Sequence, residues 1–133
     1  EYTAEEQEFA RALQRAAGVE PSGMDGSIHP LEGQEPEGGS TDEGDVSYNV
    51  PTLHLSVTTG PRDVPWHSWY VVASSTSSVG RKGMMQAAKA MAATMVDLYQ
   101  KPDALEAVKQ DFRTKMQGRT YKSYIPPGPP RVP

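Results

Sequence analysis

The sequence contains no cysteine, which excludes disulfide bonds and thiolate metal sites. Aromatic residues are scarce at 8%, and no apolar run approaches the roughly 20 residues that a membrane-spanning helix needs. The net charge is −4 and the lysines and arginines are not clustered, whereas nucleic-acid binding requires a concentrated positive surface. We therefore expect neither a nucleic acid nor a membrane as a partner.

Proline and glycine are abundant instead, with 12 of each among 133 residues, and they gather in two stretches. Residues 20–45 hold eight acidic residues, six glycines and no lysine or arginine. Such a segment buries too little apolar area to offset its ordering entropy, so we expect a flexible acidic loop over residues 20–37. Residues 125–133 contain five prolines and predict an extended tail, for which docking to a proline-binding module is an alternative role.

The length suits one small domain with a modest core. The sequence begins at Glu1 without an initiator methionine or a signal-peptide pattern. We expect a fragment of a longer protein, and a cytoplasmic location because no export signal is visible.

Three helices are indicated by their caps and periodicity. Thr3 and Glu6 form a Thr-x-x-Glu capping box, which begins a helix over residues 3–17. Pro102 begins another helix, which ends near Gly118. The longest helix is predicted over residues 79–100 by apolar side chains every three or four residues: Met84, Ala88, Met91, Met95 and Leu98. Its many alanines favour a buried central helix, and a hydrophobic groove for a partner is the alternative.

Two short strands are expected between the helices. Residues 52–58 alternate between apolar and polar side chains, and residues 69–73 form a short apolar, β-branched and aromatic run. Helices and strands together predict an α/β fold: a helix, a long loop, two or so strands and two further helices.

Asp42 and Asp45 lie in a glycine-rich acidic stretch, three residues apart, so a helical turn would place them on one face. The spacing does not match a calcium-binding loop. Helix capping by Ser40, Thr41 or Asp42 is the simplest interpretation from residue types alone.

His67 lies between two tryptophans in Pro65-Trp66-His67-Ser68-Trp69. By residue type it is either a hydrogen-bonded structural histidine or a ligand. No Gly-x-Ser-x-Gly nucleophile motif and no phosphate-binding glycine motif is present.

Taken together, these motifs resemble a known pattern. Residues 39–52 are similar to the Gly-Ser-Thr-Asp-x-x-Asp-Val-Ser-x-x-x-Pro stretch of the aminobenzoyl-glutamate hydrolase-like amidohydrolases. The Pro65–Trp69 motif, and then Gly80-x-Lys82-Gly83-Met84 leading into an alanine-rich helix, continue the match in the same order. The similarity covers about residues 3–118. These proteins belong to the larger family of two-metal aminoacylases and glutamate carboxypeptidases.

The resemblance implies the C-terminal part of a zinc-peptidase-like α/β sandwich, over residues 1–124, with residues 125–133 as the tail. In that family a lid domain interrupts the catalytic domain and mediates dimerisation, which implies a homodimer or heterodimer. His67 falls at the position of a metal-ligand histidine, Asp42 at an acidic position beside the metal centre, and Asp45 matches the motif with a less defined role. The remaining ligands and the general-base glutamate belong to the family's N-terminal part, which nothing here matches.

The implied function is metal-dependent hydrolysis of the amide bond of N-acyl or N-aroyl amino acids, such as aminobenzoyl-glutamate, by metal-activated water. The cofactors would be two divalent ions, zinc or manganese. Two ions need several carboxylate and imidazole ligands, so we expect this fragment alone to bind none and to be inactive. The alternative is a non-catalytic protein-interaction module built from the acidic loop, the Met/Ala helix and the proline tail.

Overall fold

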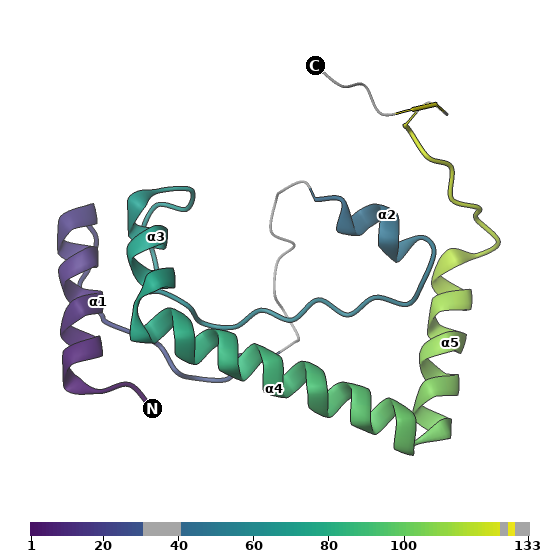
Figure 1. The fold of residues 1–133 in the computed structure, drawn as a ribbon, viewed down its shortest axis with the longest axis horizontal. Helices are drawn as coiled ribbons and strands as arrows, with labels where there is room; N and C mark the ends of the chain where they lie inside the picture. Colours follow the sequence, from purple (N-terminus) through teal and green to yellow (C-terminus); the bar gives the residue numbers. More distant parts are fainter. Residues whose placement is uncertain (31–40, 126–127, 130–133) are drawn as a thin grey trace. The chain divides into compact units, whose positions relative to one another are not determined.

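The computed structural model describes residues 1–30, 41–125 and 128–129. This part of the chain forms the following helices (Figure 1): α1 (Ala4–Ala17), α2 (Glu43–Ser47), α3 (Trp69–Thr76), α4 (Ser78–Gln100) and α5 (Pro102–Met116). The chain divides into two compact units. The first consists of Glu1–Glu35 and Leu55–Met95, and the second of Pro36–His54 and Val96–Pro133.

The helix ends follow the predicted caps. The Thr3 hydroxyl accepts from the Glu6 amide at 3.2 Å, and the Glu6 carboxylate accepts from the Thr3 amide at 2.8 Å, which completes the capping box of α1. Gly18 ends α1 in the left-handed conformation, with φ of 73°. Pro102 begins α5, and Gln117 ends it with φ of 49°.

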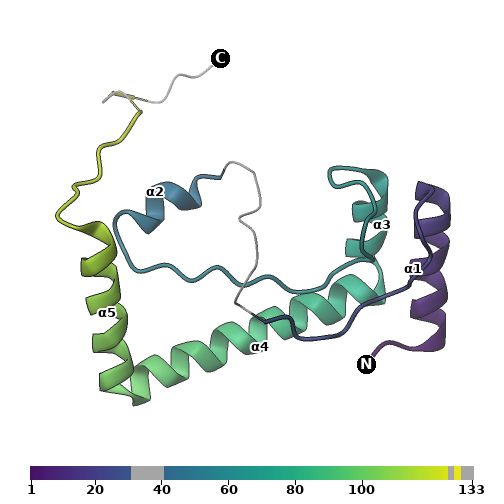
Figure 2. The same ribbon diagram turned by 180° about the vertical axis from the view of Figure 1, so that it is seen from behind.

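The first unit places α1, α3 and the start of α4 side by side (Figures 1 and 2). Its buried apolar residues are few: Ala10, Leu13, Met24 and Val79. Tyr2 and Phe9 pack against this small cluster. Because so little apolar area is buried, polar contacts between the helices carry much of the packing.

Glu6 is the main polar contact between α1 and α4. Its carboxylate accepts from the Ser78 hydroxyl at 2.7 Å and from the Lys82 ammonium at 2.6 Å, and it is buried. The hydrogen bond from Lys82, followed by those from Ser78 and Thr3, lowers the pKa of Glu6 to about 2. The carboxylate therefore stays ionised and joined to α4 at neutral pH.

Gly83 allows the chain to pass closely over α4. A Cβ atom at this position would lie 2.6 Å from the Thr58 carbonyl oxygen and 2.6 Å from the Thr59 methyl carbon. Only a glycine fits there without moving the backbone at residues 58–59.

The predicted α/β sandwich is wrong, because the described residues contain helices and no strand. Residues 69–73 belong to α3, in which the Ser74 and Thr76 hydroxyls donate to the Tyr70 and Val72 carbonyls. A helix satisfies its backbone groups within the segment, whereas a strand needs a neighbour to pair with. The apolar run thus forms a helix here.

Residues 52–58 also form no strand. They belong to no helix, and within the described part of the chain they make no backbone ladder with another segment. Leu53 is 73% exposed and Leu55 43% exposed, so the apolar side of the predicted strand is not buried. Alternation therefore predicted a strand wrongly, because it carries no information on whether a pairing partner exists.

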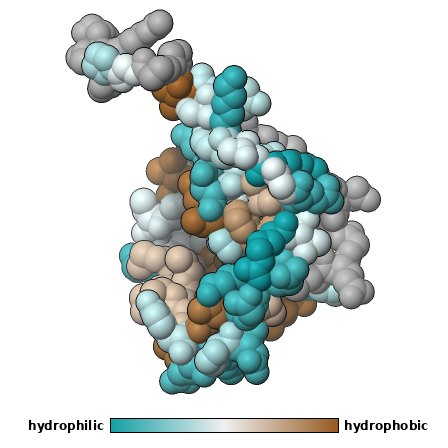
Figure 3. Space-filling view, turned by 90° about the vertical axis from the view of Figure 1, so that its right-hand side faces the viewer, coloured by the Kyte–Doolittle hydropathy of each residue, from teal (hydrophilic) through white to brown (hydrophobic). Residues whose placement is uncertain are grey.

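The expected burial of the long helix is wrong as well. Four methionines of α4 are at least half exposed: Met84, Met85, Met91 and Met95. Only three residues of α4 are buried, all in its first two turns: Val79, Gly80 and Gly83. Apolar side chains, in brown, are visible on the surface beside polar ones in Figure 3. No helix in the described ranges is both long and apolar enough to cross a membrane.

The two stretches rich in proline and glycine are described only in part. Residues 31–37 of the predicted acidic loop, and residues 126–127 and 130–133 of the predicted tail, lie outside the described residues. Residues 22–24 lie along α1 and exchange hydrogen bonds with the side chains of Gln7 and Gln14.

Candidate functional site

His67 is presented on the loop that precedes α3, in the first unit. Its backbone is left-handed, with φ of 58°, and its side chain is exposed. The Trp66 and His67 rings meet edge to face, with centroids 6.4 Å apart. The loop and the start of α3 line an open hollow formed by Trp66, His67, Ser68, Trp69, Val71 and Val72. The imidazole is thus exposed to solvent, with the Trp66 ring against it and Trp69 lining the same hollow.

The loop is attached to α1 at its start and just after its end. The Gln14 side-chain amide donates to the Arg62 carbonyl at 3.2 Å, and the Tyr70 hydroxyl donates to the Ala16 carbonyl at 2.9 Å. The Arg62 guanidinium also pairs with the Asp25 carboxylate at 2.8 Å. These contacts hold the histidine loop against α1 and the segment that follows it.

Asp25 belongs to a small exposed cluster with Ser27 and His29. Hydrogen bonds from the Ser27 hydroxyl and amide, with a smaller contribution from Arg62, lower the pKa of Asp25 to about 2. The His29 ring nitrogen lies 3.2 Å from the Asp25 carboxylate and 2.6 Å from the Arg62 guanidinium. The cluster fastens residues 25–29 to the histidine loop.

Asp42 and Asp45 lie in the second unit, at the start of α2. Asp42 is the N-cap residue but makes no side-chain capping bond, and the Thr41 hydroxyl accepts from the Glu43 amide instead. Every residue of α2 is exposed. A helical turn, which would place these aspartates on one face, is present here, and both residues are exposed to solvent. His54 lies in the same unit, with its imidazole 3.0 Å from the Glu43 carboxylate.

The described residues do not form a metal site by themselves. No group of three or more histidine, aspartate or glutamate side chains with metal-binding geometry occurs among them. One exposed imidazole provides a single ligand, and zinc in proteins is usually held by three or four protein ligands. The donor set of the described residues therefore does not fit a complete metal centre, and further ligands would have to come from other residues.

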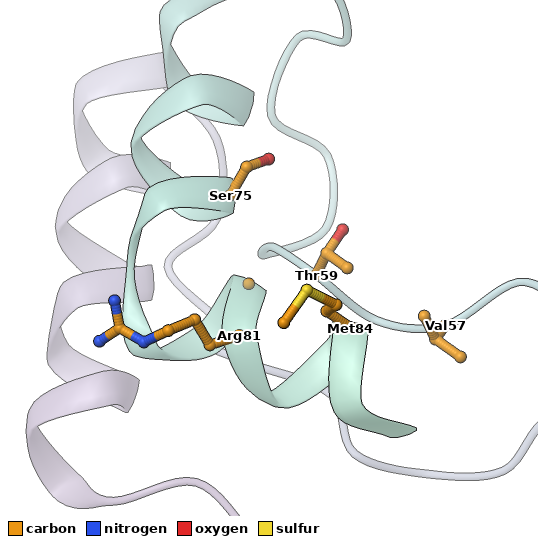
Figure 4. A pocket seen from close by; sticks show the side chains of 6 residues that line it. Val57, Thr59, Ser75, Arg81 and Met84 are labelled. Carbon is orange, nitrogen blue, oxygen red and sulfur yellow. The ribbon is translucent and has the colours of Figure 1, made fainter. Parts of the chain in front are cut away.

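A second hollow in the first unit lies between residues 57–59 and the junction of α3 and α4 (Figure 4). Thr59, Ser75 and Met84 line it, and the Arg81 guanidinium points away from these side chains in the close-up view. Without a charged group directed into it, this hollow offers less for recognition than the one beside His67.

Two of the residues that matched the family pattern have structural roles in this chain. Lys82 pairs with Glu6, and Gly83 allows the close passage of residues 58–59. Gln14, which supports the histidine loop, was not anticipated. The sequence feature that could have indicated this role is a glutamine directly after Leu13 on the buried side of α1, seven residues after Gln7.

Comparison with known proteins gives matches to part of the chain. It is 34% identical over 87 residues to a subunit of the p-aminobenzoyl-glutamate hydrolase of Escherichia coli (strain K12), a stretch that covers 65% of this chain and 18% of that protein. It is 35% identical over 87 residues to the Xaa-Arg dipeptidase of Homo sapiens, covering 65% of this chain and 20% of that protein. The Xaa-Arg dipeptidase of Mus musculus is 35% identical over 79 residues, which cover 59% of this chain and 18% of that protein.

No family model matches the chain, and no solved structure matches it significantly. The matched stretch spans about a fifth of the length of the relatives from Escherichia coli and Homo sapiens. The resemblance predicted from the Gly-Ser-Thr-Asp and Pro-Trp-His motifs is nevertheless confirmed: the chain is a partial homologue of p-aminobenzoyl-glutamate hydrolase and the Xaa-Arg dipeptidases, and so resembles a piece of an amidohydrolase.

Proposed function

We propose that this chain is part of a metal-dependent amidohydrolase in which His67 is one metal ligand. The observation that carries the proposal is the exposed imidazole on a loop held at both ends, within a chain that matches a named hydrolase and two named dipeptidases. The other ligands of a centre with two divalent ions, zinc or manganese, would come from residues outside those described. By itself the chain is expected to be inactive.

The proposed substrate is the amide of an acyl or aroyl group with an amino acid. p-Aminobenzoyl-glutamate and an Xaa-Arg dipeptide, which appear in the names of the relatives, share an amide bond to the nitrogen of an amino acid. Trp66 is 71% exposed and Trp69 57% exposed, and both border the hollow beside His67. Aromatic faces stack on flat rings, which favours an aroyl group such as aminobenzoyl on this side of the site.

Asp42 and Asp45 are proposed as acidic residues of the same active site, with Asp42 as the neighbour of the metal centre. Their exposed carboxylates at the start of α2 are free to act on a ligand. The name of the Escherichia coli relative describes one subunit of an assembly. We accordingly propose that the complete protein works as a homodimer or heterodimer.

The test uses the longest natural polypeptide that contains this sequence, with His67→Ala and, as a matched control, His54→Ala. Metal content is measured by elemental analysis, and hydrolysis is measured with p-aminobenzoyl-glutamate and with an Xaa-Arg dipeptide. We expect His67→Ala to lose bound metal and activity, while His54→Ala, whose imidazole pairs with Glu43, keeps both. Full metal content and activity in His67→Ala would overturn the assignment.

The role of the tryptophans is tested separately by Trp66→Leu and Trp69→Leu. If they contact the acyl group, KM for an aroyl substrate rises while KM for an aliphatic acyl analogue stays the same. An equal rise for both substrates would show that the indoles support the loop and do not select the acyl group.

A protein-interaction module is the second candidate, favoured by the exposed methionines of α4. An apolar row of this kind is typical of a surface that binds another protein segment. The two candidates differ in the outcome of His67→Ala, which would leave binding of a partner unchanged if interaction were the function of the chain.

A further inference from the structure

Gln14 is a fully buried polar side chain with both ends of its amide engaged. Its carbonyl oxygen accepts from the Gly23 amide at 2.8 Å, and its nitrogen donates to the Ser22 hydroxyl at 3.0 Å and to the Arg62 carbonyl at 3.2 Å. A buried amide is costly unless its hydrogen bonds are made, so this position favours one arrangement of the three partners. Gln14 thus fixes the Arg62 carbonyl relative to α1.

The loop that follows Arg62 needs such support. Asp63 and His67 are both left-handed, with φ of 64° and 58°. Non-glycine residues in this conformation are strained and persist where the surroundings hold them. The Tyr70 hydroxyl, bonded to the Ala16 carbonyl, fixes the chain just beyond the other end of the loop. Both anchoring groups, Gln14 and the carbonyl of Ala16, belong to α1.

We propose that α1 is the platform that sets the direction of the His67 imidazole, with Gln14 as the principal positioning residue and Tyr70 as the second. The positioning follows from the contacts above, and its importance for catalysis rests on the proposed function of His67. Neither residue touches a reacting group. Their effect is to restrict the backbone on which the ligand is carried.

The experiment is Gln14→Glu in the full 133-residue chain, followed by NMR between pH 4 and pH 9. A protonated carboxyl group at this position can still donate to the Arg62 carbonyl and accept from the Gly23 amide, whereas a carboxylate only accepts. The pKa values of Glu6 and Asp25 are both about 2, so those groups stay ionised across this range. Other ionisable groups are the same in both proteins, so the response of the introduced group is the difference between Gln14→Glu and the unsubstituted chain at each pH.

We expect backbone order parameters of residues 62–68 to be close to the rigid value of about 0.85 at low pH in Gln14→Glu, and to fall toward about 0.6 as its carboxyl group ionises. The nuclear Overhauser contact between the Trp66 and His67 rings should weaken over the same pH interval. The unsubstituted chain should show neither change. A role in packing volume alone would not produce this dependence on pH.

Gln7→Glu is the matched control. Gln7 lies two turns earlier on α1, accepts from the Met24 amide at 2.8 Å and donates to the Met24 carbonyl at 3.3 Å, and makes no hydrogen bond to the histidine loop among the contacts described. The Gln7→Glu variant introduces the same charge on the same helix as Gln14→Glu. We expect it to loosen Met24 and leave residues 62–68 unchanged.

Unchanged order parameters in Gln14→Glu, or an equal loss in Gln7→Glu, would overturn the proposal. If Gln14→Glu unfolds the whole chain, Tyr70→Phe decides, because it removes only the hydroxyl bonded to Ala16: local loosening of the loop supports the platform, and an unaltered loop refutes it. These results do not depend on metal. If Gln14→Glu loses loop order while His67→Ala keeps full activity, the role of α1 is supported and the proposed function is rejected.

Discussion

Replacing Gly83 with alanine tests whether residues 58–59 lie directly on α4. In the middle of a helix, alanine is favoured over glycine by about 1 kcal/mol, so helix propensity alone predicts a more stable protein. The structure predicts the opposite. The new Cβ would lie 2.6 Å from the Thr58 carbonyl oxygen, well inside ordinary contact distance, and the clashing atom belongs to the backbone.

The expected magnitude follows from these two opposing effects. Overpacking of a well-packed contact costs about 1–3 kcal/mol, which exceeds or cancels the gain in propensity. We expect a net loss of about 1 kcal/mol and at most about 2 kcal/mol. For a unit of this size, each kcal/mol lowers the melting temperature by roughly 4–8 °C.

The assay is thermal unfolding followed by circular dichroism and by tryptophan fluorescence, since both tryptophans lie in the first unit. Gly44→Ala is the matched control: Gly44 lies within α2, and a Cβ there would meet no atom within 4 Å. It should leave the first unit's transition unchanged. A higher melting temperature for Gly83→Ala would show that residues 58–59 do not rest on α4, and the reasoning would fail.

Two further predictions concern charge and exposure. The pKa of Glu6 is lowered from 4.5 to about 2, so its contribution to stability is present above pH 4.5 and is lost as the pH falls toward 2. Glu6→Gln should therefore reduce the change of melting temperature with pH between pH 4.5 and pH 2. An unchanged slope would mean that Glu6 does not link α1 to α4. The exposed methionines of α4 should bind the dye ANS. The double variant Met91→Lys, Met95→Lys should lose most of the ANS fluorescence. Equal fluorescence in the double variant and the unsubstituted chain would contradict the exposure of these side chains.

Helices α1, α4 and α5 could be predicted because their signals are local. The Thr3 and Glu6 capping box, and Pro102 at the start of α5, act within a single turn and need no tertiary partner. The strands could not be predicted correctly, because period-two alternation says nothing about whether a neighbouring strand exists. Residues 52–58 have no backbone ladder among the described contacts.

Burial was mispredicted for the same reason. The row at Met84, Met91 and Met95 has the spacing of a buried face, yet burial depends on a second surface that the spacing cannot supply. The resemblance likewise identified Lys82 and Gly83 as part of a pattern without giving their roles, which required the positions of Glu6 and Thr58. The proposed roles of Asp42, Asp45 and His67 remain predictions.

The paired glutamines of α1 have a consequence for how this protein tolerates change. Gln7 bonds the main chain of Met24, and Gln14 bonds the main chain of Gly23 and Arg62, so apart from the bond from Gln14 to the Ser22 hydroxyl these contacts recognise peptide groups. Substitutions at Met24 or Arg62 leave the peptide groups in place. A one-residue insertion or deletion beside them would shift every donor and acceptor out of reach. These hydrogen bonds should therefore tolerate side-chain changes at Met24 and Arg62 better than changes in the length of either segment.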